Sequence, residues 1–436
     1  MKNNAYKYIL EPFINFTRQE SFSGILLLLL AAIAMFWANS SYADSYFALW
    51  YSKIVIGFGE NQFSQNLHFW INDGLMAIFF FLVGLEIKRE LIAGELSSFR
   101  LAALPLFGAI GGMLFPALIF TFFNSGSYKI NGWAIPTATD IAFSLGILSL
   151  LGNRISVKLK VFLVALAIVD DMGAVIIIAI FYSKNVAVYW IVISVLIFLI
   201  QIGANLLRVR IIWIYVALGI LLWIALLNAG IHPTIAGVLT AAAVPAMTKI
   251  KRSEFLEECR YHLNDFEEAS KFKTPIIVNK EQQEALISIE EACEKVQAPL
   301  LSIEHKLHPW VTFLIMPIFA FSNAGVKLEG GIGNAFNDSI VLGIILGLVI
   351  GKPLGITMLA WFSVRLKIAD LPEGESFMKI LGIGFVAGIG FTMSLFIANL
   401  AFGDGHNLDI SKIGILTGSL LSGIIGYFLL KSFSKV

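Results

Sequence analysis

Residues 161–181 read VFLVALAIVDDMGAVIIIAIF, an apolar run whose only charged members are the adjacent acids Asp170 and Asp171. A run of about 18 or more apolar residues predicts a transmembrane helix. On the insertion scale the two acids together cost roughly 5–7 kcal/mol, whereas the thirteen Leu, Ile, Val and Phe residues return roughly 4–8 kcal/mol. The segment can therefore insert, and we expect its acids to face the interior of a helix bundle or an aqueous cavity.

The whole chain is poor in charge. Of its 436 residues, 58% are hydrophobic and 14% are charged, whereas a soluble domain has about 25% charged and 45–50% apolar residues. We therefore expect a protein that crosses the lipid bilayer many times. Its net charge of +1 gives no reason to expect a nucleic-acid partner. The two cysteines, Cys259 and Cys293, lie in the one long polar segment and are expected to be free thiols.

Twelve apolar segments are candidate spans, although the turn Asn228–His232 alone separates the seventh from the eighth, so that eleven is the alternative. Lysine and arginine gather in every second connection. Because positively charged connections stay in the cytoplasm, this alternation predicts cytoplasmic termini and an even number of spans. The sequence thus predicts one all-α polytopic membrane domain over residues 1–436, with twelve transmembrane helices near residues 22–38, 67–93, 101–124, 133–151, 157–182, 186–206, 211–229, 231–248, 308–326, 338–364, 379–402 and 411–431.

Two connections are longer than simple links. The outer loop 39–66 contains KIVIGFGENQFSQN (53–66), which alternates apolar and polar residues around a Gly-Glu-Asn turn. This pattern predicts a β-hairpin, with an irregular loop as the alternative. Residues 249–307 form a charged cytoplasmic insertion. There Asn279 and Gln282 resemble a capping box, and the periodicity of the insertion predicts two amphipathic helices.

Two spans contain residues that interrupt a helix. The fourth contains AIPTATDIAF, with Pro136 and Asp140, and the eleventh contains VAGIGFTMSLF, with Gly390 and Thr392. Proline removes a backbone donor and glycine weakens a helix, and either alone is an ordinary kink. These two spans, however, are the middle members of spans three to five and ten to twelve, which run in opposite directions. The pairing predicts inverted repeats with two interrupted helices and a transport site near the membrane midplane.

Charged groups in the spans form the main candidate site. Asp170 and Asp171 point about 100° apart on a helix, so that one can face a water-filled path while the other faces protein. Lys352, in the VIGKPLGI of the tenth span, is a cation that can face them; the alternative is that its side chain reaches toward the cytoplasm. Asp140 can neutralise the positive ends of the interrupted helices.

Weaker candidates lie near the ends of spans. They are Asp73 in the outer part of span two, Glu86 and Glu90 at its inner end, and Glu304, His305 and His308 before span nine. Because histidine titrates near neutral pH, the last group can form a pH-responsive mouth. A salt-bridge cluster is the usual interpretation of Glu86 and Glu90. For His232, between spans seven and eight, a structural role at a helix end is favoured over ligation.

The motifs resemble those of one family along nearly the whole chain. They are ATDIAF, ALAIVDDMGA, GKPLGI, AGIGFTMSLFIA, WINDGLMAIFF and GLEIKREL, and together they closely resemble the NhaA family of bacterial sodium–proton antiporters. The resemblance implies twelve helices with two crossed, interrupted helices and a homodimer formed through the outer β-hairpin. It also implies electrogenic, pH-regulated exchange of Na⁺ or Li⁺ outward for a larger number of protons inward, in the bacterial inner membrane.

The resemblance also assigns roles to individual residues. Asp171 matches the main ion ligand, Asp170 matches the acid that pairs with the membrane lysine, here Lys352, and Asp140 and Thr139 match the TATD motif. The residues that match the pH-sensing funnel are Glu86, Glu90, Glu304, His305 and His308.

We therefore expect an ion transporter, not an enzyme, without any cofactor. Na⁺ prefers oxygen ligands, which Asp171, Asp170, Thr139 and water can supply, and protons compete for the same carboxylates. Three alternatives remain open at this point. A sodium-coupled symporter needs a second cavity for a solute, and a proton channel conducts without sodium. An intramembrane aspartyl hydrolase needs two carboxyls that meet at one water, which adjacent residues of one helix suit poorly.

Overall fold

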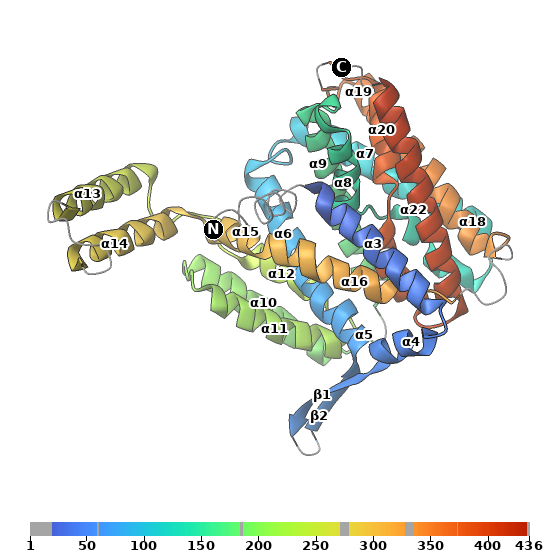
Figure 1. Cartoon of the computed structure of the whole chain (residues 1–436), viewed down its shortest axis with the longest axis horizontal. Coiled ribbons are helices and arrows are strands. Elements are labelled where there is room, and N and C mark those ends of the chain that lie inside the picture. Colours follow the sequence, from blue (N-terminus) through green and yellow to red (C-terminus); the bar gives the residue numbers. More distant parts are fainter. Residues whose placement is uncertain are drawn as a thin grey trace, which may run out of the picture.

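The computed structural model describes residues 20–58, 61–183, 186–270, 279–327, 335–372 and 374–433. Within these ranges the chain is helical, apart from one two-stranded sheet and short connections (Figure 1). Its apolar helices confirm the prediction of an all-α membrane protein. Six continuous helices among the described residues are long and apolar enough to cross a membrane, namely α7 (Phe99–Asn124), α9 (Val157–Phe181), α10 (Val188–Leu206), α11 (Ile212–Ala229), α18 to α19 (Ser339–Arg365) and α22 (His406–Phe433).

Three bent helix pairs pass the same test as the continuous spans. They are α3 (Glu20–Ala38) with α4 (Ala43–Tyr51), η3 and η4 (Tyr128–Thr137) with α8 (Ile141–Leu150), and α20 (Phe377–Ala387) with α21 (Phe391–Phe402). The second and third pairs bend by 41° and 51°. These bends lie in predicted spans four and eleven, where the sequence indicates interrupted helices, because the backbone leaves the helical path at residues 138–140 and 388–390.

The three remaining predicted spans are helical too, but they do not pass that test of length and composition, and twelve spans stays a prediction. Predicted span two lies in the continuous helix α5–η2–α6 (Leu67–Ala93), and most of predicted span nine lies in the longer helix α15–η6–α16 (Pro299–Asn323). Predicted span eight is helical only over α12 (Ile235–Ala243). The helix that carries span nine begins at Pro299, inside the predicted insertion, because proline suits a first helical turn.

The inversion of the two repeats is visible in how their first helices pack. α7 lies along α19, which follows α18 (Ser339–Leu346) and η7 (Gly347–Gly351). At one end Ser339 Oγ lies 2.8 Å from Asn124 Oδ1, and at the other Arg100 Nη2 lies 2.8 Å from Asp370 Oδ2. The end of α7 therefore meets the beginning of α18, and the two helices are antiparallel, as inverted repeats require.

Glycines let these first helices approach closely. A Cβ on Gly355 would overlap the carbonyl oxygen of Gly111, and a Cβ on Gly111 would overlap the carbonyl oxygen of Gly355. The backbones of α7 and α19 are thus in direct contact, as is common where small residues line a membrane helix interface.

The spans form two groups by their packing (Figure 1). The repeat bundle consists of α7, η3, η4, α8, α9 and α18 to α22. The flanking bundle consists of α3, α5, η2, α6, α10, α11, α12, α15, η6 and α16. Each group packs mainly within itself: α7 on α19 and α20 on α22 in the first, α6 on α12 and α10 on α11 in the second. Between the groups, α3 packs on α8 more extensively than on α16, α6 packs on α9, and α16 contacts α21.

The predicted hairpin is present, because β1 (Lys53–Phe58) pairs antiparallel with β2 (Asn61–Asn66). Residues 59 and 60 of its turn lie outside the described residues. Isoleucines and valine on β1 are exposed, and the hairpin projects from the helices (Figure 1). The loop that contains it was not expected to be helical, yet it includes α4, which is held by a hydrogen bond from Tyr46 Oη to the Phe321 carbonyl, 2.7 Å long. We call this side of the molecule the hairpin end.

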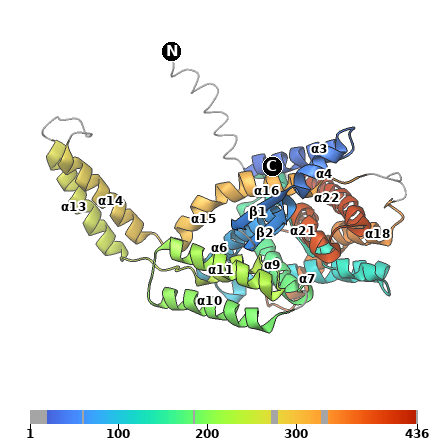
Figure 2. The same cartoon turned by 90° about the horizontal axis from the view of Figure 1, so that it is seen from below.

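The insertion forms the expected pair of helices, α13 (Arg252–Ser270) and α14 (Lys280–Val296), which extend away from the other helices in both views (Figures 1 and 2). Asn279 caps α14 by accepting a hydrogen bond from the Gln282 amide, 3.2 Å long, which confirms the predicted capping. Cys259 and Cys293 are free thiols. Residues 271–278, between the two helices, lie outside the described residues.

Candidate functional site

The two breaks in the interrupted helices touch each other. The Asp140 amide donates to the Ile389 carbonyl at 2.7 Å. Two hydroxyls also reach backbone carbonyls across the crossing: Ser144 to Val386 at 2.9 Å and Ser394 to Ile135 at 2.7 Å. Backbone groups freed by the breaks are thereby satisfied by protein, which is what makes irregular backbone stable inside a membrane.

Asp140 caps two half-helices at once. Its Oδ1 accepts a hydrogen bond from the Phe143 amide, at the start of α8, 2.9 Å long. Its Oδ2 accepts from the amide and the hydroxyl of Thr392, at the start of α21, at 3.1 and 2.5 Å. The side chain is 1% exposed. Because helix N-termini carry partial positive charge, one carboxylate between two of them stabilises both, as the sequence predicts for this aspartate.

Lys352 and Asp170 form a fully buried ion pair. The Lys352 Nζ lies 2.9 Å from Asp170 Oδ2, and neither side chain is exposed. Lys352 also donates to the carbonyl of Thr137 at 2.5 Å, at the end of η4. The hydroxyl of Thr139 lies 2.7 Å from Asp170 Oδ2 and 3.0 Å from the Ala387 carbonyl. The lysine therefore does not reach toward the cytoplasm. Its ammonium sits where a C-terminal helix end carries partial negative charge.

Asp171 has a different environment from its neighbour. It is 1% exposed, and neither of its carboxylate oxygens has a hydrogen-bond partner among the described residues. The same is true of Asp170 Oδ1. Three carboxylate oxygens on two successive residues are therefore left without a donor in a water-poor interior. Such groups are costly unless they bind a proton or a cation.

The residues that match the pH-sensing funnel come together only in part. Arg89 Nη1 lies 2.5 Å from Glu304 Oε1, and Arg89 Nη2 lies 3.0 Å from Glu90 Oε1. Arg89 therefore links α6 to α15, and Glu86 is a half-buried residue one turn before Glu90. Burial raises the pKa of Glu304 above its usual range, and Arg89 opposes that rise. On the same helix, His305 and His308 are exposed.

Asp73 has a partner that sequence reasoning missed. Its Oδ1 lies 3.2 Å from His232 Nε2, and His232 Nδ1 lies 2.7 Å from the Thr234 hydroxyl. The pair joins span two to the start of α12. The pair agrees with the structural role expected for His232. No contact between described residues links Asp73 to the region around Asp171.

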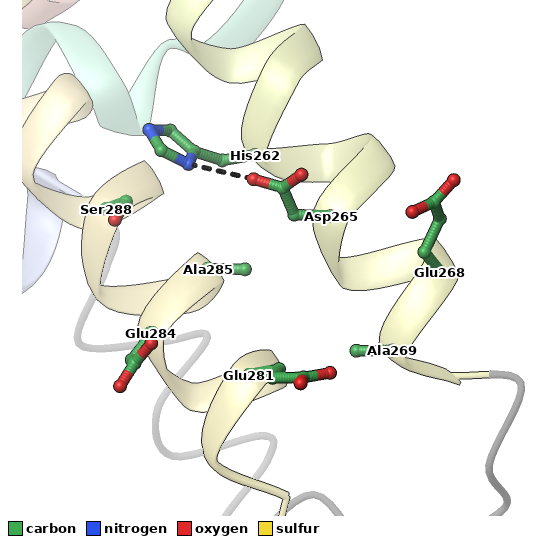
Figure 3. A pocket seen from close by; sticks show the side chains of 8 residues that line it. All are labelled: His262, Asp265, Glu268, Ala269, Glu281, Glu284, Ala285 and Ser288. Atoms are coloured by element: carbon green, nitrogen blue, oxygen red, sulfur yellow. Dashed lines mark ion pairs between the residues drawn. The ribbon is translucent and has the colours of Figure 1, made fainter.

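One pocket lies far from these acids, between α13 and α14 (Figure 3). It has a volume of about 620 Å³. On α13, His262 points toward Asp265, and His262 Nδ1 lies 3.6 Å from Asp265 Oδ2. Its other charged lining residues are Glu268, Glu281 and Glu284. None of the predicted ion-site residues lines it.

Comparison with known proteins identifies similar sequences along nearly the entire chain. A family model described as Na+/H+ antiporter 1 matches residues 14–430. The Na(+)/H(+) antiporter NhaA of Oleidesulfovibrio alaskensis is 47% identical over 423 residues, covering 97% of this chain and 94% of that protein. The protein of the same name from Wolinella succinogenes is 47% identical over 415 residues, covering 95% and 92%. That of Helicobacter pylori strain HPAG1 is 47% identical over 425 residues, covering 97% and 95%.

Proposed function

The chain belongs to the Na+/H+ antiporter 1 family, and from that premise we propose that Na⁺ and protons compete for the carboxylates of Asp170 and Asp171. The protein is an integral membrane sodium/proton antiporter, a transporter and not an enzyme. The observation that carries the proposal is the pair of unpartnered oxygens on Asp171, supported by the free Oδ1 of Asp170.

The competition follows from the chemistry of the site. A buried carboxylate is stabilised either by a bound proton, which removes its charge, or by a cation that neutralises it. Na⁺ takes oxygen ligands, and the Asp171 carboxylate, Asp170 Oδ1 and the Thr139 hydroxyl are the groups we propose as its ligands, with water completing the shell. Because one group cannot hold both partners at once, binding of Na⁺ expels protons, and protonation expels Na⁺.

Lys352 gives the exchange its charge imbalance in this proposal. Na⁺ that approaches Asp170 competes with the Lys352 ammonium, 2.9 Å from the same carboxylate. A lysine that loses its buried partner releases a proton more readily, because burial disfavours its charged form. The carboxyl of Asp171 and the ammonium of Lys352 can thus each release a proton when one Na⁺ takes the carboxylates, so that more protons than Na⁺ move and the exchange is electrogenic. Li⁺ has the same ligand preference and is a proposed second substrate.

Alternating access then requires the breaks to move as a unit. Asp140, the two breaks and Lys352 all belong to the repeat bundle and are hydrogen-bonded to one another. We propose that this bundle moves against the flanking bundle and exposes Asp171 to one side and then the other. The cluster of Glu90, Arg89 and Glu304 joins α6 to α15 in the flanking bundle, and it is the proposed place where pH regulates the motion.

We further propose that the protein lies in the bacterial inner membrane with cytoplasmic termini; residues 1–19 and 434–436 are outside the described part. A homodimer through the hairpin is proposed because a two-stranded sheet has unpaired edges and is marginally stable alone. Its exposed apolar residues include Ile54, Val55 and Ile56. Replacing residues 53–66 by a short glycine–serine link is expected to give monomers, and light scattering of the purified protein measures the mass; an unchanged mass would reject this interface.

Transport in inside-out vesicles tests the main proposal. Adding Na⁺ or Li⁺ is expected to move protons in the wild type and in Asp370→Asn, whose side chain is 71% exposed and pairs with Arg100 at the start of α7. Asp171→Asn is expected to insert normally and move none. A proton channel would conduct without Na⁺, and a symporter would require an added solute. Na⁺-driven proton movement in Asp171→Asn that equals the wild type would reject the assignment.

A further inference from the structure

Four polar side chains form a hydrogen-bonded network at the hairpin end. Asn399 Nδ2 donates to Asn323 Oδ1 at 2.8 Å, and Asn323 Nδ2 donates to Asn72 Oδ1 at 2.9 Å. His68 Nε2 lies 3.1 Å from Asn323 Oδ1, and Asn72 Nδ2 lies 3.1 Å from the His68 ring. A neutral His68 with its proton on Nε2 satisfies both contacts. Asn323 has no exposed surface, and Asn72 is 8% exposed.

The network joins the two bundles. Asn399 belongs to α21 of the repeat bundle, whereas Asn323 ends α16 of the flanking bundle, and His68 and Asn72 belong to α5 and η2. A second contact crosses the same boundary beside it. Lys412 of α22 is 6% exposed and donates to the carbonyl of Gly325, two residues after Asn323, at 3.4 Å.

The network lies between the ion site and the hairpin itself. Asn399 follows the break at Gly390 by nine residues, which is roughly 13 Å along α21 at 1.5 Å per residue. His68 lies directly after the hairpin, where Asn66 caps α5 by accepting from the Phe69 amide at 2.7 Å. An ion that moves from Asp171 to the hairpin end must therefore pass the network that joins the two bundles.

The network differs from the ion site in one decisive respect. The amide oxygens of Asn323 and Asn72 already accept hydrogen bonds, whereas both oxygens of Asp171 have no donor among the described residues. It is therefore not a second ion site. Bonds between neutral amides are weak enough to break and re-form, because water can replace each partner when the gap opens.

Resting on the exchange mechanism proposed above, we propose that His68, Asn72, Asn323 and Asn399 form a latch that closes the hairpin side of the ion path, and that the bond between Asn399 and Asn323 breaks in every cycle. We call these four residues the hairpin-end latch. Motion of the repeat bundle that opens the hairpin side separates α21 from α16, and closing it re-forms the bond.

A reversible crosslink across the latch tests this directly. Asn323→Cys and Asn399→Cys are combined in a chain that carries Cys259→Ser and Cys293→Ser, so that the introduced thiols are the only ones. A short bis-methanethiosulfonate reagent joins them, thiol counting verifies the joining, and dithiothreitol reverses it. Na⁺/H⁺ exchange in vesicles is expected to proceed in the reduced protein, stop on crosslinking and return on reduction.

The matched control crosslinks two residues of the same bundle. Asn124 and Ser339 are also hydrogen-bonded, at 2.8 Å, but both belong to the repeat bundle. Asn124→Cys combined with Ser339→Cys is expected to exchange equally well before and after crosslinking. Exchange that continues while the thiols introduced at Asn323 and Asn399 are joined would overturn the latch and leave the proposed function intact. Loss of Na⁺-driven proton movement in the unaltered chain would overturn the function itself.

If the two cysteine substitutions stop transport before any crosslink is made, a single substitution tests the latch instead. Asn399→Ala removes the bond of the latch that joins α21 to α16, and so favours the state open at the hairpin side. The apparent KM for Na⁺ is expected to fall about two- to tenfold at the hairpin face and to rise at the opposite face. Vesicles of the two orientations measure each face. Misfolding would lower the maximal rate without opposite changes in KM, and equal KM values for variant and wild type would reject the latch.

Discussion

The ammonium of Lys352 lies 2.9 Å from the carboxylate of Asp170, and both side chains are completely buried. Removing one member of such a pair leaves the other charge without compensation in a medium of low dielectric constant. The usual cost is about 3–5 kcal/mol, whereas replacing both members by neutral groups of similar size is often close to neutral.

We therefore expect Lys352→Met to lower the free energy of unfolding by about 3–5 kcal/mol. Combining it with Asp170→Asn should restore most of the loss. Thermal unfolding of the purified variants in detergent measures both. A double variant no more stable than Lys352→Met would show that the two side chains do not stabilise each other.

Asp140 is expected to matter for stability as the shared cap of α8 and α21. Asp140→Ala removes the acceptor of three hydrogen bonds, and each lost cap costs about 0.5–2 kcal/mol. Thr392→Val removes only the hydroxyl contact and should cost less. Thermal unfolding of the two variants shows which is less stable. A loss of stability for Thr392→Val equal to or larger than that for Asp140→Ala would contradict the double-cap assignment.

The contact of α7 with α19 predicts the effect of a single methyl group. Gly355→Ala places a Cβ against the Gly111 carbonyl oxygen, and overpacking of this kind costs about 1–3 kcal/mol. Gly203→Ala in α10 is the matched control, because no atom lies within 4 Å of the added Cβ. That change should stabilise by about 0.5–1 kcal/mol. Equal unfolding temperatures for the two variants would argue against direct backbone contact.

Glu304 predicts a pH dependence with a definite sign. Because burial raises its pKa in the folded protein, the folded state holds this proton to a higher pH than the unfolded state does. Its contribution to stability is therefore complete below the ordinary carboxyl pKa of about 4.3 and is lost as pH rises through the raised value. Glu304→Gln should remove that loss. Unfolding temperatures measured across this range check it, and a wild type that gains stability over Glu304→Gln as pH rises would contradict it.

The four buried charges of the site could be predicted from the sequence for a physical reason. A charged group in an apolar span has few stable environments, so Asp140, Asp170, Asp171 and Lys352 were expected to face the bundle interior, and the structure places them there. The breaks near Asp140 and Gly390 could be predicted from proline and glycine. The assignment of these residues to ion binding stays a prediction.

Other features had no signal in the sequence. Lys352 bonds to the Thr137 carbonyl, and a backbone acceptor can belong to any residue type. Asp73 and His232 are 159 positions apart, and nothing in either local pattern indicates that they meet. By contrast, the helix start at Pro299 has a local signal, because proline suits a first helical turn, but the helix passes from polar insertion to apolar span without a break, so periodicity alone does not locate its start.

Proton release from the purified protein tests the central claim most directly. Na⁺ is added to the detergent-solubilised protein in weakly buffered solution, and the protons released per molecule are measured. The competition at Asp170 and Asp171 predicts saturable release from the wild type and from Asp370→Asn, and loss of that release in Asp171→Asn. Release from Asp171→Asn equal to that of the wild type would contradict the claim that Na⁺ and protons share this carboxylate.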